Sequence, residues 1–228
     1  MAEMGNGYGS ECHLLRYLGR HRNCLDQRVL EAVGGSAISW LDFGFDRSKK
    51  RWPDAEWKGM DFLPADEPAK AAWRAFWPWS GNVPNWDAVG RITTKRREEW
   101  LLVEAKAHVA ETHSSCGAKA AGGLDQIIRA FGETKRALGV SPDRDWLTGH
   151  YQYCNRITSL HFLVAHSVPA RLLFIYFTGD ESDPPTRVCP QNDHEWLDTL
   201  KRQADHVGLP RNHLLADRIH TLFLPVAI

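Results

Sequence analysis

The stretch Trp86–Val109 reads WDAVGRITTKRREEWLLVEAKAHV, and it predicts the central hairpin of a β-sheet. Two runs rich in β-forming residues, Trp86–Thr94 and Glu99–Val109, flank a charged connection at Lys95–Glu98. A connection this short joins antiparallel neighbours. We therefore expect the two runs to pair directly, each strand folding back on the other.

Side chains on a strand point alternately to its two faces, so the second run separates into two sets. One face carries Leu102, Glu104, Lys106 and His108. The opposite face carries Val103, Ala105, Ala107 and Val109, which are apolar and mostly small. The apolar set suits a helix packed closely against the sheet. The polar set places an acid and an amine in the middle of a sheet, where a charge is costly without further partners.

The hairpin also determines where Asp87 lies. If the turn contains an even number of residues, Asp87 is directly opposite either Glu104 or Lys106, depending on where the turn is centred within 95–97. Directly opposed residues point to the same side of the sheet. Either register brings two carboxylates and an ammonium group together, whereas an odd loop or a bulge would turn Asp87 away.

Such a set is suited to metal-dependent hydrolysis. Two carboxylates, a backbone carbonyl and waters form a common Mg²⁺ site. The ion activates a water and stabilises charge on a phosphate oxygen, and Lys106 is placed to orient that water. The polar face therefore predicts a nuclease-type active site.

This pattern is similar to that of the PD-(D/E)xK nuclease superfamily. The resemblance rests on Asp87, followed after sixteen intervening residues by Glu104-Ala105-Lys106. It implies a restriction-endonuclease-like αβββαβ core, with Asp87, Glu104 and the Ala105 carbonyl as ligands of Mg²⁺ or Mn²⁺. It also implies that Lys106 assists the nucleophile and that DNA is the substrate. Trp86 departs from the pattern, because a proline often stands before the aspartate.

Other residues are candidates of lower rank. The resemblance implies a glutamate on the first core helix, for which Glu31 is the candidate metal ligand. His108 continues the polar face of the strand, and Gln126 is a downstream glutamine that lacks the aromatic residue expected after it. Basic residues near the motif are candidates for contact with a nucleic-acid backbone. They are Lys95, Arg96, Arg97 and Lys119.

The E-x-K tripeptide alone is not specific. It occurs three times, at Glu56–Lys58, Glu104–Lys106 and Glu133–Lys135. The first lies in a predicted loop, and the third lies in a predicted helix, where residues two apart do not face each other. Only the second has a strand context and an upstream hairpin aspartate. The alternative interpretation is a solvated ion pair on a wet face of the sheet.

The rest of the chain predicts helices alternating with strands. Helices are expected from about Asn23 to Gly34, at Pro68–Phe76, at Leu124–Gly139, from Asp145 to about His166 and at Asp193–Val207. Further strands are expected at Ala37–Phe45, Arg171–Thr178 and Ile219–Val226, and a loop at Asp46–Asp66. This order predicts an α/β fold in which helices flank a mixed central β-sheet.

The length of 228 residues suits one globular domain. Residues 1–22 form an N-terminal segment, 23–178 the nuclease-like core with an insertion at 46–85, and 179–228 a helix–strand extension of the same domain. No apolar run is long enough for a membrane helix, and the polar start lacks the character of a secretory signal. Five scattered cysteines indicate no disulfide framework. We therefore expect a cytoplasmic protein.

Charge and aromatic content keep two other functions open. Twenty-eight basic and twenty-eight acidic residues cancel, which counts against a protein that coats nucleic acid through a large positive field but leaves room for a local basic groove. Seven of the ten tryptophans lie between Trp40 and Trp86, and such residues often mark protein contacts. One alternative is thus a non-catalytic interaction module that binds a protein partner. Another is an RNA-directed nuclease with the same site. Nothing in the sequence indicates the oligomeric state.

Overall fold

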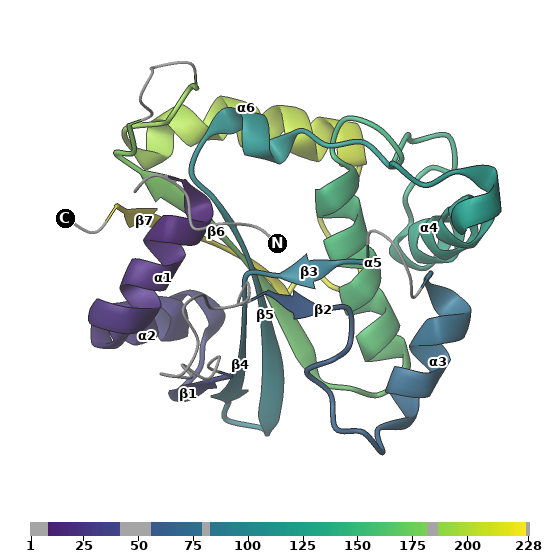
Figure 1. Ribbon diagram of the computed structural model, residues 1–228, viewed down its shortest axis with the longest axis horizontal. Helices are drawn as coiled ribbons and strands as arrows, with labels where there is room; N and C mark the ends of the chain where they lie inside the picture. Colours follow the sequence, from purple (N-terminus) through teal and green to yellow (C-terminus); the bar gives the residue numbers. More distant parts are fainter. Residues whose placement is uncertain (1–8, 42–55, 79–82, 182–186, 227–228) are drawn as a thin grey trace, which may run out of the picture.

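A computed structural model describes residues 9–41, 56–78, 83–181 and 187–226. Within these residues the centre is a five-stranded sheet (Figure 1). Its strands lie in the order β1 (Ala37–Trp40), β4 (Ala88–Thr93), β5 (Glu98–Lys106), β6 (Ala170–Thr178) and β7 (Ile219–Pro225). β4 is antiparallel to β1 and β5, whereas β5, β6 and β7 are parallel. The predicted α/β class with a mixed sheet is confirmed.

Helices cover both faces of this sheet (Figure 1). One face is covered by α1 (Ser10–Arg20) and α2 (Arg22–Val33). The other is covered by α3 (Pro68–Phe76), α4 (Leu124–Leu138), α5 (Tyr151–Ala165) and α6 (Asp193–Val207). Val103 and Ala105 pack with α1 and α2, while Leu102 packs with the second group of helices. The predicted alternation along β5 is confirmed, and its small side chains do lie beneath helices.

The hairpin has the first of the two expected registers. Ala88 pairs with Val103 and Thr93 with Glu98, so the turn is centred between Lys95 and Arg96. The Thr94 hydroxyl accepts hydrogen bonds from the backbone N–H groups of Arg96 and Arg97, at 3.3 and 3.2 Å. Continued by one residue, this register would oppose Asp87 and Glu104, but the paired ladder ends at Ala88 and Val103.

The strand predicted at Trp86–Thr94 is interrupted at Asp87. Trp86 belongs to β3 (Asn85–Trp86), which pairs with β2 (Trp57–Lys58) in a separate two-stranded sheet. The predicted loop at 46–66 is therefore wrong at β2, and residues 42–55 lie outside the described residues. The Trp86 indole is buried and donates to the Gly59 carbonyl at 2.8 Å, which draws the chain out of the main sheet. Asp87 is left between the two ladders.

Three other boundaries differ from expectation. α1 lies in the segment 1–22, for which no helix was predicted, and α2 begins at Arg22. The strand expected to reach Val109 ends at Lys106, and a short 3-10 helix, η1 (Val109–Thr112), follows. Asp145 does not cap α5. Its carboxylate instead accepts hydrogen bonds from two N–H groups in a turn, and α5 starts six residues later, at Tyr151.

Most of the described tryptophans fill the interior. Seven of the eight that the structure describes are buried, at positions 40, 73, 77, 86, 100, 146 and 196. Trp73, Trp77 and Phe131 form part of one aromatic cluster between the helices and the sheet. These side chains therefore provide core packing rather than a surface for stacking bases or binding a partner.

The described helices are short. The longest of them, α4, α5 and α6, have 15 residues each, fewer than the roughly 20 that a membrane span requires. Among the described residues, no helix is both long and apolar enough to cross a membrane.

Three histidines lie against one another near the start of α5. The ring centroid of His150 is 5.0 Å from that of His113 and 5.2 Å from that of His206. His150 Nδ1 lies 2.8 Å from the Thr112 carbonyl, which only accepts, so the neutral ring carries its hydrogen on Nδ1. Burial lowers the pKa of His150, and the charges of His113 and His206 lower it further, against the opposite effect of the Thr112 hydrogen bond.

Acidification is expected to destabilise the fold through this cluster. A histidine whose pKa is lowered by folding takes up its proton first in the unfolded chain, so stability falls as the pH drops below about 6.5. His150→Asn keeps a donor for Thr112 and removes the titrating ring. Urea unfolding measures the free energy of unfolding at about pH 7.5 and about pH 5.5. Between these pH values the variant should lose less of it than the wild-type protein does, by at most about 1.4 kcal/mol per pH unit. An unchanged pH dependence would contradict this role.

Candidate functional site

β5 extends further than its neighbour β4. The last paired residues are Ala88 and Val103, so Glu104–Lys106 continue beyond the end of β4. On the other side, Glu104 and Lys106 still lie beside β6. The end of β5 therefore has one open edge, and Asp87 lies at that edge.

Asp87 takes the place of the missing strand partner. Its N–H donates to the Val103 carbonyl at 3.1 Å, and its Oδ2 accepts from the Ala105 N–H at 2.6 Å. The N–H and C=O of one residue in a strand point to the same side. The Ala105 carbonyl therefore also faces the side on which Asp87 lies, and the two carboxylates and this carbonyl share one region.

Glu104 is 1% exposed, so the alternative of a solvated surface pair is wrong. Its Oε1 accepts a hydrogen bond from Lys106, and its Oε2 lies 2.6 Å from Nε of Arg156, which is on α5. Burial alone would raise the pKa of Glu104. The charges of Arg156 and Lys106 outweigh burial, and the pKa is lowered. Glu104 is thus held as a carboxylate by two cations.

Lys106 is held as an ammonium group. Its Nζ also donates to Oε1 of Gln152 on α5, at 2.9 Å. Burial alone would lower its pKa, but the charges of Glu104 and Asp87 more than compensate, and the pKa is raised. Lys106 can therefore donate hydrogen bonds and offset negative charge, but it is not a neutral base at physiological pH.

Asp87 has the opposite electrostatic environment from Glu104. Its pKa is raised well above the usual value, first by burial and then by the charge of Glu104, against the smaller effects of Lys106, the Ala105 N–H and Arg156. Glu104 thus has its counter-charges in place, whereas Asp87 lacks sufficient positive charge. A cation beside Asp87 would supply it.

These residues line a cavity of about 390 Å³. Its walls come from the start of α1, the residue before β2, the residue after β3, the end of β5, η1, α5 and the segment between β6 and α6. Five carboxylates contribute to the lining: Glu11, Glu56, Asp87, Glu104 and Glu111. Lys106, Gln152 and Arg187 are among the other lining residues. The cavity thus combines mostly acidic side chains with a few positive ones.

The donors fit a hard divalent cation in kind. Carboxylate and carbonyl oxygens are the ligands that Mg²⁺ takes, usually from one or two carboxylates with waters completing the shell. Asp87, Glu104 and the Ala105 carbonyl offer such a set. Among the described residues there is no cluster of three or more histidine, cysteine, aspartate or glutamate side chains arranged to hold a metal. The available set is therefore two carboxylates and one carbonyl.

The other candidates lie elsewhere. Glu31 is exposed on α2, accepts a hydrogen bond from Gln27 at 3.0 Å and does not line the cavity. Lys119 is exposed before α4 and does not line it either. His108 is buried, caps η1 and lies 3.4 Å from Glu111, so it has a structural role there.

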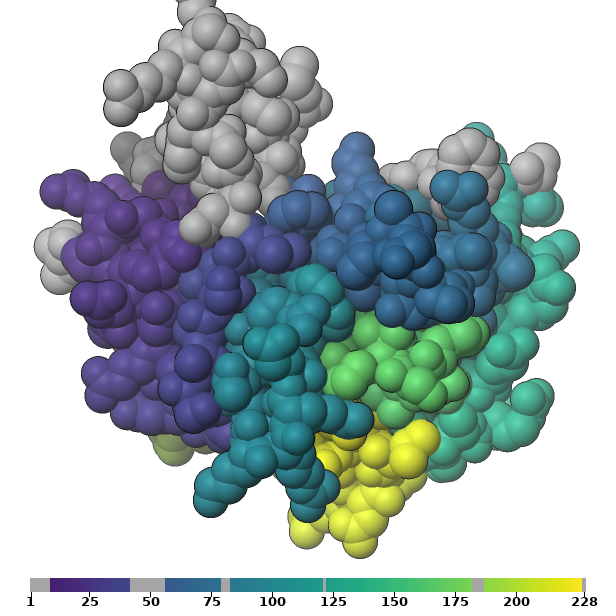
Figure 2. Space-filling view, turned by 90° about the horizontal axis from the view of Figure 1, so that it is seen from below, coloured from purple at the N-terminus to yellow at the C-terminus, as the bar shows by residue number. Residues whose placement is uncertain are grey.

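The basic turn is at the opposite end of β5 from the cavity. Lys95, Arg96 and Arg97 are exposed, and Nε of Arg97 pairs with Glu99 at 3.3 Å. Arg97 lies seven positions before Glu104, roughly 23 Å along a strand. The hairpin projects from the surface at that end (Figure 2). The structure therefore does not bring the basic turn to the carboxylates.

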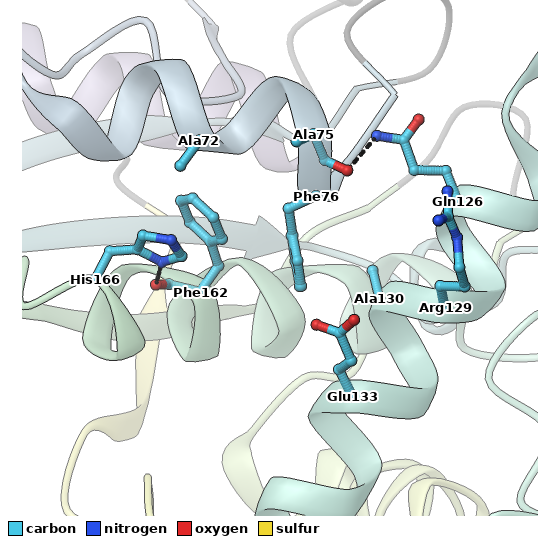
Figure 3. A pocket seen from close by; sticks show the side chains of 9 residues that line it. All are labelled: Ala72, Ala75, Phe76, Gln126, Arg129, Ala130, Glu133, Phe162 and His166. Carbon is cyan, nitrogen blue, oxygen red and sulfur yellow. Dashed lines mark hydrogen bonds between the residues drawn. The ribbon is translucent and has the colours of Figure 1, made fainter.

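Gln126 belongs to a different cavity, of about 320 Å³, between α3, α4 and α5 (Figure 3). Its amide Nε2 donates to the carbonyls of Arg74 and Ala75 at the end of α3, at 3.1 and 3.0 Å. Phe76 and Phe162 lie along this cavity, with their ring centroids 4.9 Å apart. Gln126 thus joins two helices and has no contact with the carboxylate site.

Gln152 and Arg156 are the two site residues that were missed. They lie four apart on α5, a spacing that places them on one face of a helix. The sequence contains that signal, since both are long polar side chains four positions apart within the predicted helix. The apolar positions of this helix predict which side is buried, not which neighbour the polar residues meet. The third dimension was needed to show that this polar face meets the end of β5.

Comparisons with protein-family models, with curated proteins and with solved structures found no match to this chain.

Proposed function

We propose that this chain is a Mg²⁺-dependent nuclease of the PD-(D/E)xK type that hydrolyses phosphodiester bonds in DNA. The observation that carries the proposal is the meeting of Asp87, Glu104, the Ala105 carbonyl and Lys106 at the open edge of β5. The element order supports it as well. A helix, α2, precedes β1, β4 and β5, and helices lead on to β6, as the resemblance implies.

Asp87, Glu104 and the Ala105 carbonyl would hold the ion. When bound, a divalent cation supplies an activated water and neutralises charge that develops on a phosphate oxygen. Asp87 gains the positive charge that its raised pKa indicates it lacks. Glu104 is already ionised and aimed by its contacts with Lys106 and Arg156.

Lys106 would act as a cation in this reaction. Because its pKa is raised, it keeps its proton and does not take one from water. It orients the attacking water through a hydrogen bond and offsets charge on the phosphate. Gln152 accepts a second hydrogen bond from Nζ and so holds the amine in the cavity.

Cleavage of supercoiled plasmid in Mg²⁺ or Mn²⁺ tests the proposal. Wild-type protein should nick or linearise the plasmid, and Asp87→Asn should not. Lys119→Met, a change at an exposed residue outside the cavity, serves as the control and should cleave normally. A parallel panel of single-stranded DNA and RNA separates the RNA-directed alternative. Cleavage that survives both Asp87→Asn and Lys106→Met would contradict the assignment.

Lys106→Met should reduce the cleavage rate without abolishing metal binding. A positioned donor that stabilises charge developing in the transition state contributes about 10²- to 10³-fold, so a loss in that range is expected. Mn²⁺ affinity should stay the same or increase, because the substitution removes a positive charge from beside Glu104. Calorimetric titration alongside single-turnover cleavage checks both parts. Parallel loss of binding and cleavage would contradict a role at the nucleophile.

One observation favours the second candidate, a non-catalytic interaction module. Both oxygens of Glu104 are already paired with cations, as they would be in a purely structural network. The described tryptophans no longer support that alternative, because almost all of them are buried. Absence of Mn²⁺ binding at millimolar concentrations would favour the module.

A further inference from the structure

Arg156 is more enclosed than Lys106, the other cation that contacts Glu104 at the candidate site. It is 3% exposed, and its Nε lies 2.6 Å from Oε2 of Glu104, which is itself buried. Its Nη1 donates to the Asn155 side chain at 2.7 Å. The guanidinium carbon lies 5.0 Å from the centre of the Trp86 ring. Three separate contacts thus fix this group in place.

These contacts connect both candidate ligands to one guanidinium group. Glu104 is held directly. Asp87 follows Trp86 in the chain, and Trp86 is fully buried beside Arg156. A guanidinium group remains charged under all ordinary conditions, so its effect on the site is permanent.

The two cations that share Glu104 differ in their freedom to move. Lys106 has a flexible side chain and a second acceptor, Gln152, at 2.9 Å. It can therefore leave Glu104 without losing every partner. Arg156 is buried on all sides and stacked on an aromatic ring, so moving it would leave a buried charge unpaired. A divalent ion that shares Glu104 would displace Lys106 and retain Arg156 as a neighbour.

We propose that Arg156 is a positioning residue that tunes the affinity of the Asp87–Glu104 site for divalent cations. It holds Glu104 towards Asp87, and its fixed positive charge weakens the binding of a second cation there. This inference rests on the proposed function, since it assumes that the two carboxylates bind a metal. Arg156 contacts neither the attacking water nor the phosphate in this account and acts only through Glu104.

Titration calorimetry with MnCl₂ tests this inference on wild-type protein, Arg156→Met and Arg156→Lys. Methionine fills similar space without charge, and lysine keeps the charge. Arg156→Met should bind Mn²⁺ more tightly by on the order of tenfold or more, because one positive charge is removed from beside a divalent ion. Arg156→Lys should remain close to wild type. A purely structural role predicts weaker binding in both variants, because Glu104 would lose its orientation.

The outcomes separate this inference from the proposed function. If wild-type protein binds Mn²⁺ and Arg156→Met binds it equally or more weakly, the tuning role is overturned and the metal site stands. If no variant binds Mn²⁺, both the proposed function and the inference fail. Binding by Arg156→Met alone would support the inference. Circular dichroism confirms folding first, and if the methionine variant does not fold, Arg156→Gln is titrated with the same expectations.

Discussion

Asp87→Asn is expected to abolish Mn²⁺ binding and DNA cleavage while making the folded protein more stable. Removing one of two carboxylate ligands leaves Glu104, whose oxygens are already paired with Lys106 and Arg156. The asparagine carbonyl can still accept the hydrogen bond from Ala105 that Asp87 Oδ2 accepts at 2.6 Å. Local structure is therefore preserved while the charge is lost.

The gain in stability follows from the pKa of Asp87. That pKa is raised in the folded protein by burial and by Glu104, so folding disfavours the carboxylate. The resulting penalty is absent at low pH, where Asp87 is protonated in both the folded and the unfolded protein. It appears as the pH rises above about 3.9, the pKa of an aspartate in the unfolded chain. Asparagine avoids it at neutral pH.

Urea unfolding followed by tryptophan fluorescence measures this effect. Asp87→Asn should raise the midpoint at neutral pH, and the difference should disappear towards about pH 4. A gain of about 1 kcal/mol corresponds to about 2–4 °C in Tm for a domain of this size. Asp198→Asn, at an exposed position on α6, serves as the control and should change little. A lower midpoint for Asp87→Asn at neutral pH would contradict the electrostatic account.

Glu104→Gln is expected to cause the largest loss of stability of any single change at the site. Arg156 and Lys106 are both buried against this carboxylate, with 3% and 12% of their side chains exposed. Removing one partner from a buried ion pair leaves an uncompensated charge and costs about 3–5 kcal/mol. Glutamine also has an NH₂ group in place of one carboxylate oxygen. That group is a donor and would face Lys106 or Arg156, which are donors too. The free energy of unfolding should therefore fall by about 3 kcal/mol or more.

Glu98→Gln is the matched control on the same strand. Glu98 pairs with Arg91 at 2.8 Å, but its side chain is 61% exposed. Exposed pairs contribute about 0–1 kcal/mol, so this variant should unfold almost as wild type does. Similar losses for both variants would show that burial of the Glu104 pair contributes nothing, contrary to the role assigned to Arg156 and Lys106.

The hairpin and its polar face could be predicted because they follow local rules. Side chains alternate along β5, and a two-residue turn at Lys95 and Arg96 sets which residues are opposed. Together these predict Asp87 opposite Glu104, one residue beyond the last pair that forms, Ala88 and Val103. No information from distant parts of the chain is required.

The break at Asp87 could not be predicted in the same way. It arises because Trp86 pairs with Trp57 across a long insertion. Arg156 was missed for a similar reason, since it is 52 residues from Glu104 along the chain. Which face of α5 meets the end of β5 depends on how the helix packs, and periodicity alone does not determine it.

α1 is a different kind of omission. Leu14, Tyr17 and Leu18 are buried and have helical spacing, so the pattern was present in the sequence. The short apolar stripe follows a glycine-rich, polar start, and residues 1–22 were expected only to form an N-terminal segment. The helix is also stabilised by distant contacts. His13 lies 2.8 Å from Asp180, at the end of β6.

The central claim is that Asp87 and Glu104 together bind a divalent cation. Electron paramagnetic resonance of Mn²⁺ titrated into the protein measures this most directly, because the sharp signal of the free ion is lost when it binds. We predict that wild-type protein and Asp198→Asn remove the free signal saturably, while Asp87→Asn leaves it unchanged. Equal binding by wild-type protein and Asp87→Asn, or binding by neither, would contradict the claim.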